Sequence, residues 1–135
     1  MYQKNRTVST CEQLDLGRDP RSFLRLWGPP LLLIVIGTLA QQIPGWPLAA
    51  SGLLWSGSIF WLGASCALNA LRCGRFHCMV LGIAYPLLGL LALGITFGRV
   101  PIHWNPFWAF IFLPITLIAF IPEFFGLKYI GSKAG

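Results

Sequence analysis

Residues 26–71 read LWGPPLLLIVIGTLAQQIPGWPLAASGLLWSGSIFWLGASCALNAL, and these 46 consecutive residues carry no charge. Two further uncharged stretches of 23 residues follow, one between Arg75 and Arg99 and one between Arg99 and Glu123. A helix needs about 20 mainly apolar residues to cross a bilayer. The first stretch is therefore long enough for two spans, and each of the other two for one.

The composition of the whole chain excludes a water-soluble fold. Of its 135 residues, 56% are hydrophobic and only 10% are charged, whereas a soluble domain carries roughly 25% charged residues. The same apolar content excludes an intrinsically disordered chain. Spans in hydrocarbon are helices or closed barrels, and runs such as 31–36 and 107–112 are apolar on every face, unlike barrel strands. The sequence predicts an all-α integral membrane four-helix bundle.

Turn-forming residues and charges mark the ends of the predicted spans. Pro44-Gly45-Trp46-Pro47, for example, predicts a tight turn between the first two spans. We expect an N-terminal tail over 1–22, a membrane domain over 23–126 and a C-terminal tail over 127–135. The four predicted spans of the membrane domain are at about 26–43, 48–72, 78–97 and 106–126.

The basic residues are concentrated on one side of this arrangement. Arg99 alone lies on one side, and the other nine of the ten Lys and Arg residues flank the opposite ends of the spans. Such flanks stay in the cytoplasm. We therefore expect both termini to be cytoplasmic, in a bacterial inner membrane. The net charge of +6 is then a topology signal, and we expect a lipid bilayer and no nucleic acid as partner.

The segment Arg72-Cys73-Gly74-Arg75-Phe76-His77-Cys78 concentrates the reactive side chains of the chain. Thiolates and imidazole are ligands of soft or borderline metals such as copper, zinc and mercury, and nearby arginines favour thiolates. Cys66 lies on the same predicted helix face as Cys73, deeper in the span, and Cys11 in the N-terminal tail is a further candidate. We expect the protein to bind or pass a soft metal ion through the ligands Cys73, His77, Cys78 and Cys66.

Two other interpretations of these cysteines stay open. Their C-x4-C spacing belongs to no well-defined zinc site, so the segment also fits a charged turn with inert, reduced thiols. Thiol redox chemistry is the second alternative, although the chain has no C-x-x-C motif. The sequence also has no nucleophile elbow, Walker motif or H-E-x-x-H motif, so we do not expect an enzyme.

Three charged residues near this segment are candidates for ion pairing and orientation: Arg72, Arg75 and Glu123. Glu123 is the only acidic residue after Asp19 and lies near the cytoplasmic end of the fourth span. Charged groups at such depth are usually paired. We expect Glu123 to pair with Arg72, Arg75 or Lys128, and a role as a cation or proton ligand is the alternative.

The second span also has a face of small residues, Gly52, Ser56, Gly63 and Ala67, which recur at helical spacing. Small residues let a neighbouring helix approach closely. The face therefore predicts ordinary helix packing, or a docking surface for a membrane-protein partner or a second copy of the chain. The second use leads to our alternative function, a non-catalytic accessory subunit of a larger membrane complex.

The run from Asn69 to Cys78 resembles a loop in a group of small four-helix bacterial membrane proteins, in which an R-C-G-R-x-H-C sequence joins two spans. A later Pro-Glu pair closes the last helix of that group, as Pro122-Glu123 does here. The group often has Thr-Gly-Pro after the second cysteine, where this chain has Leu81-Gly82-Ile83. The resemblance covers part of the chain and implies that this loop is functionally important, without naming a substrate.

Overall fold

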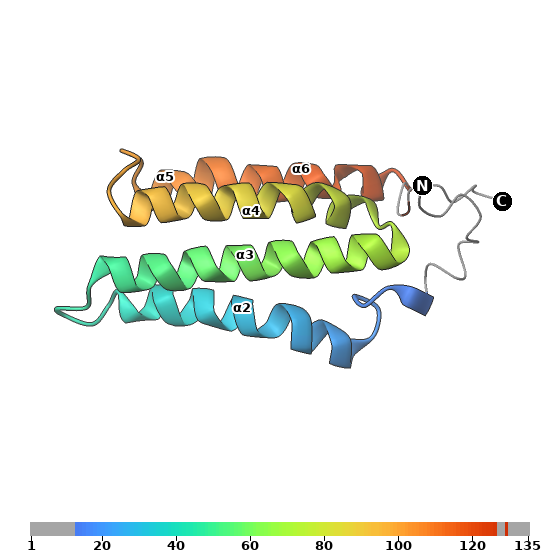
Figure 1. The fold of residues 1–135 in the computed structure, drawn as a ribbon, viewed down its shortest axis with the longest axis horizontal. Helices are drawn as coiled ribbons and strands as arrows, with labels where there is room; N and C mark the ends of the chain where they lie inside the picture. The colour runs from blue at the N-terminus through green and yellow to red at the C-terminus, as the bar shows by residue number, and fades with distance from the viewer. Residues whose placement is uncertain (1–12, 127–128, 130–135) are drawn as a thin grey trace.

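A computed structural model describes residues 13–126 and residue 129 (Figure 1). Apart from turns, loops and one isolated bridge between Arg75 and Tyr129, the described residues are helical. Four helical segments are long and apolar enough to cross a membrane. The expected four-helix, all-α membrane fold is therefore confirmed, and the protein is an integral, multi-pass membrane protein. Its elements are α2 (Pro20–Ala40), α3 (Leu48–Cys73), α4 (Phe76–Thr96), α5 (Trp104–Pro106), η1 (Phe107–Phe112) and α6 (Leu113–Phe124).

The first membrane helix, α2, begins at Pro20, before the uncharged stretch that starts at residue 26. Asp19 caps α2, because its carboxylate accepts hydrogen bonds from the backbone N–H and the hydroxyl of Ser22, at 2.9 and 2.8 Å. Pro20 occupies the first helical position, where its missing N–H costs nothing. At the other end, α2 stops at Ala40, ahead of the polar pair Gln41-Gln42. Local capping, and not hydrophobicity, thus sets where this helix begins.

A single glycine closes the turn between α3 and α4. Gly74 has a φ of +67°, in the left-handed region that residues with a side chain rarely adopt, and its N–H donates to the carbonyl of Ala70 at 2.7 Å. The chain then reverses at once, and α4 begins at Phe76. The ends of both helices, with Cys73 and Cys78, consequently lie at the same end of the bundle.

The central helix α3 packs against α2 on one side and α4 on the other (Figure 1). Close approach to α4 needs small residues, because a Cβ atom on Gly63 would lie 2.6 Å from Cδ of Pro86, and one on Gly52 would lie 2.5 Å from the Thr96 hydroxyl. Ala67 likewise lies against Gly82 of α4, and Ser56 is buried with its hydroxyl bonded to the Gly52 carbonyl. The small-residue face of α3 therefore packs against α4 of the same chain.

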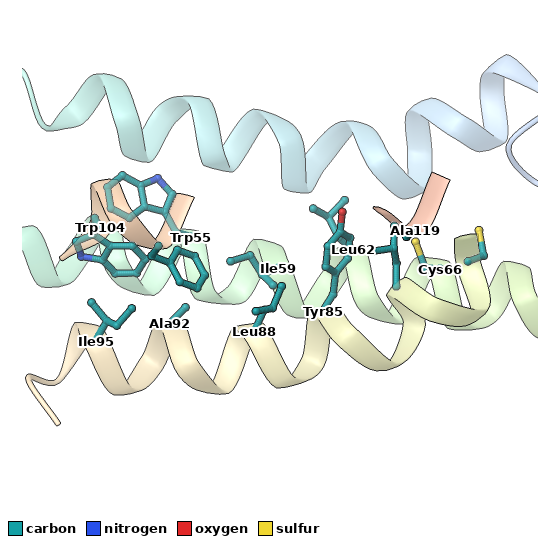
Figure 2. Close-up of a cluster of buried hydrophobic side chains, with 13 residues drawn as sticks. Trp55, Ile59, Leu62, Cys66, Tyr85, Leu88, Ala92, Ile95, Trp104 and Ala119 are labelled. Carbon is teal, nitrogen blue, oxygen red and sulfur yellow. The ribbon is translucent and has the colours of Figure 1, made fainter. Parts of the chain in front are cut away.

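The core runs along the bundle between these helices (Figure 2). Trp55 and Trp104 mark one end of it, with ring centroids 4.6 Å apart, and Cys66 lies toward the other end. Ile59 and Leu62 of α3 and Tyr85 and Leu88 of α4 fill the space between. Trp61, by contrast, is 45% exposed on the outer surface of α3.

The fourth membrane helix contains an irregular turn that the sequence analysis did not predict. Residues Phe107–Phe112 form a π-helix, which continues directly into α6. Pro114 has no N–H, and in a regular helix its ring would collide with a carbonyl of the preceding turn. The wider π turn relieves that collision. It also places Phe112 in a stack with Tyr85, with ring centroids 5.2 Å apart.

Candidate functional site

A network of polar side chains closes one end of the bundle. It is assembled from the loop before α2, the last turns of α3, the Gly74 turn, the first turn of α4 and the end of α6. The antiparallel order of the helices brings these segments together, although they are far apart in sequence; Asp15 and Arg75, which bond directly, are 60 residues apart. Its main side chains are Asp15, Asn69, Arg75, His77, Cys78 and Glu123.

Asn69 connects the N-terminal loop to the helices. Its amide oxygen accepts the Leu16 N–H at 2.9 Å, and its amide nitrogen donates to the Asp15 carboxylate at 2.9 Å and to the Cys78 sulfur at 3.4 Å. The residue is only 1% exposed. A buried amide with its oxygen and nitrogen both bonded holds its neighbours in one arrangement, so Asn69 fixes Asp15 against the end of α3.

Arg75 joins two carboxylates that are far apart in the sequence. It donates to Asp15 at 2.8 Å through one terminal nitrogen, and to Glu123 at 3.2 and 3.4 Å through Nε and the other terminal nitrogen. Burial by itself would lower the pKa of Arg75, but the hydrogen bond to Glu123 and the negative charge of Asp15 outweigh it, so the pKa is raised. Arg75 therefore stays positively charged and compensates both carboxylates.

The His77 imidazole lies between a carboxylate and a thiol. Its Nδ1 is 2.5 Å from Glu123 Oε1, and its Nε2 is 3.3 Å from Cys78 Sγ. The ring is also stacked on Phe120, with centroids 4.2 Å apart. A carboxylate at Nδ1 favours a proton on that nitrogen and leaves Nε2 as an acceptor. The arrangement therefore presents a basic nitrogen, fixed in direction, to the Cys78 thiol.

The three cysteines of the described part of the chain are free thiols in different surroundings. Cys66 and Cys78 lie near each other in the buried core at the α3–α4 contact, and Cys66 also lies near the indole of Trp27. Cys73 instead donates to the Asn69 carbonyl of its own helix at 3.1 Å. The fold thus pairs Cys66 with Cys78, a combination that their spacing of twelve residues does not suggest.

The four predicted metal ligands are only partly brought together. Cys78 contacts both His77 and Cys66, whereas the Cys73 thiol is engaged by its own helix. Among residues 13–126 and 129, no three His, Cys, Asp or Glu side chains form a group that could hold a metal ion. The further candidate Cys11 lies outside the described residues. The geometry therefore provides pairs of soft donor atoms, and not a metal centre enclosed by three or four ligands.

The charged residues near the cluster take different positions. Glu123 pairs with Arg75, one of the three partners expected for it. Arg72 lies exposed in the last turn of α3, and Lys128 is outside the described residues. Asp15 was predicted only as part of the N-terminal tail, yet it is only 5% exposed and bonds to Arg75 and Asn69. No local sequence signal distinguishes it from the other polar residues before α2.

A half-open cavity of about 520 Å³ adjoins the network between the helices. All four membrane helices contribute to its wall, and Asn69, Arg75 and His77 lie at its polar end. Cys66 also lines it, whereas Cys78 does not and is fully buried. The apolar wall is largely aromatic, formed by Phe23, Trp27, Tyr85, Trp108, Phe112 and Phe120 together with Leu31, Ile34, Leu62 and Leu81.

Comparisons of the chain with protein-family models, with curated proteins and with solved structures find no match.

Proposed function

We propose that the protein binds a soft metal ion at the paired thiols of Cys66 and Cys78, with His77 as the adjoining nitrogen donor. The observation that carries this proposal is the position of Cys78, which is buried in the same cluster as Cys66 and lies 3.3 Å from His77 Nε2. Two thiols and an imidazole are a donor set suited to soft metals. We place the protein in a bacterial inner membrane, with both termini in the cytoplasm.

Glu123 supports this interpretation of His77. A histidine that binds a metal through one ring nitrogen almost always donates its other N–H to a carboxylate, a carbonyl or water, which orients the ring and raises its basicity. Glu123 occupies this position at Nδ1, while Arg75 compensates the carboxylate. His77 is therefore held with Nε2 directed at the thiol pair, before any metal arrives.

The donor geometry favours one kind of ion. Structural zinc is almost always four-coordinate, and the described residues offer no group of even three His, Cys, Asp or Glu donors. Copper(I) and mercury(II), in contrast, are satisfied by two soft donors in a line. We propose an ion of this low-coordinate class, bound first by the two thiols and exchanged with His77.

Metal analysis of the purified protein tests the proposal. The wild-type protein, loaded anaerobically with copper(I) in detergent and then desalted, is expected to retain one copper per chain. The double substitution Cys66→Ser, Cys78→Ser should abolish retention, while Cys73→Ser is the matched control and should retain the ion, since its thiol is bonded to its own helix.

Two results would contradict the site. One is copper retention that survives the double substitution, and the other is loss of copper in Cys73→Ser alone. Because serine at both positions could loosen the bundle, His77→Gln provides a second variant. The glutamine keeps a polar side chain beside Glu123. This variant should therefore weaken copper retention without abolishing it.

A further inference from the structure

The wall of this cavity indicates the kind of molecule that fits it. Trp27 of α2 lies on one side, stacked with Phe23 at 5.3 Å between ring centroids. Trp108 and Phe112 lie on the side of the π-helix, 4.9 Å apart between centroids. Flat aromatic molecules are favoured between such rings. The wall also has aliphatic surface suited to a hydrocarbon chain, formed by Leu31, Ile34, Leu62 and Leu81.

The polar groups in this wall are already bonded within the chain. Tyr85 bonds to Thr116 at 3.1 Å, and Thr116 donates to the Phe112 carbonyl, so Tyr85 supplies the proton. Asn69, Arg75 and His77 hold the partners described above. The cavity therefore favours an uncharged ligand. A charged ligand would have to break these hydrogen bonds, or its charge would lie in apolar surroundings without a partner.

A reducing group lies in the same wall. Cys66 lines the cavity, and its partner Cys78 is behind it with His77 Nε2 at 3.3 Å. Two adjacent thiols can deliver two electrons by forming a disulfide, and a nearby imidazole can move the protons. A flat, uncharged, membrane-soluble ring compound that accepts two electrons and two protons is a quinone.

We propose that the cavity binds the ring of a membrane quinone and that Cys66 and Cys78 reduce it. The Cys66 sulfur bonds to a ring carbon, and its proton passes to the quinone. Cys78 gives its proton to His77, and its thiolate attacks the Cys66 sulfur. The sulfur–carbon bond breaks, its electron pair stays with the ring, and His77 returns the proton to the product oxygen. The balance is two thiols and a quinone converted into a disulfide and a quinol.

This reaction goes beyond metal binding and needs no metal, although it uses the same two thiols. The disulfide cannot coordinate an ion as the free thiols do. Oxidation by quinone would therefore empty the proposed metal site. The two proposals are tested by different measurements, so that either can fail alone.

The experiment uses the reduced, metal-free full chain in detergent under anaerobic conditions, with a short-tailed ubiquinone analogue. One quinol per chain should form, detected by its ultraviolet absorbance. Mass spectrometry of alkylated peptides should find a Cys66–Cys78 disulfide and a free Cys73. In Cys73→Ser, the control, the quinol and the Cys66–Cys78 disulfide should form as in the wild-type protein, and in Cys78→Ser no quinol should accumulate.

Binding is read separately from the quenching of tryptophan fluorescence by the quinone. Replacing Trp108 by Leu should weaken binding roughly three- to tenfold, the value of one lost aromatic contact. Trp61→Phe, on the exposed face of α3, should leave it unchanged. Quinone that binds but leaves both thiols of the wild-type protein reduced would overturn the proposal, and so would affinity that is indifferent to Trp108. The wild-type peptide map decides the redox step even if a cysteine variant fails to fold.

Discussion

Asn69 is the residue on which the polar end of the bundle depends most. It contacts the backbone of Leu16, the carboxylate of Asp15 and the sulfur of Cys78. Each of these groups is withdrawn from water, and a buried polar group that loses its partner pays the cost of desolvation without compensation. The arrangement of the thiol site and the attachment of the N-terminal loop therefore both depend on the side-chain amide of Asn69.

Replacement of Asn69 by Ala is therefore expected to destabilise the protein by about 1–3 kcal/mol, the cost of leaving a buried group unsatisfied. Thermal unfolding in detergent measures this. Asn105→Ala is the matched control, because Asn105 is exposed in α5 and should change stability little. Equal stability of the Asn69 and Asn105 variants would show that the amide contacts contribute nothing.

At the scale of the element, the start of α2 should depend on pH. Hydrogen bonds from the hydroxyl and the backbone N–H of Ser22 lower the pKa of Asp19. A carboxyl with a lowered native pKa stabilises the folded helix at pH above its ordinary value, about 3.9. This contribution is lost as the pH falls through the lowered value.

Hydrogen exchange of the Ser22 and Phe23 amides, corrected for the intrinsic pH dependence of exchange, should accordingly become faster in acid. Asp19→Asn keeps a good N-cap without a titratable group, so its first turn should lose this acid sensitivity. An identical pH profile in the two proteins would mean that the Asp19 charge does not hold the helix start.

The contact between α3 and α4 gives a second prediction at this scale. Gly63→Ala would place a methyl group 2.6 Å from the ring of Pro86, and such overpacking typically costs about 1–3 kcal/mol. Gly57→Ala, on the same helix, meets no atom within 4 Å and should be neutral or stabilising by up to about 1 kcal/mol, because alanine favours helix. Unfolding of the two variants side by side distinguishes packing from helix propensity.

At the scale of the whole molecule, the distribution of basic residues predicts one orientation in the membrane. The Gly74 turn lies at the same end as the start of α2 and the end of α6, and Arg99 lies in the loop at the opposite end (Figure 1). A fluorescent protein fused after residue 135 should therefore fold in the cytoplasm and fluoresce. Alkaline phosphatase fused after Arg99 should be exported and active. The opposite pattern would overturn the expected orientation.

The sequence was sufficient to predict four membrane helices, because uncharged runs of that length have few other stable states in lipid. It was less informative about the site, since contacts such as Asp15 with Arg75 join residues 60 positions apart. Helical spacing put Cys66 and Cys73 on one face of the second span, but only the packing of α4 decides which thiol has a partner. The π-helix was missed for a similar reason, because Pro114 signals an irregularity without specifying its form.

The meeting of the N-terminal loop, the Gly74 turn and the end of α6 has a consequence for biogenesis. Each membrane helix packs mainly against the membrane helix made immediately before or after it. The helices can therefore associate in the order of synthesis, each finding a partner soon after insertion. The ion pairs of Arg75 with Asp15 and Glu123 need the first and last of these segments at once. The thiol pair is thus enclosed only when translation of the membrane domain is finished, which keeps an incomplete chain from presenting an assembled site.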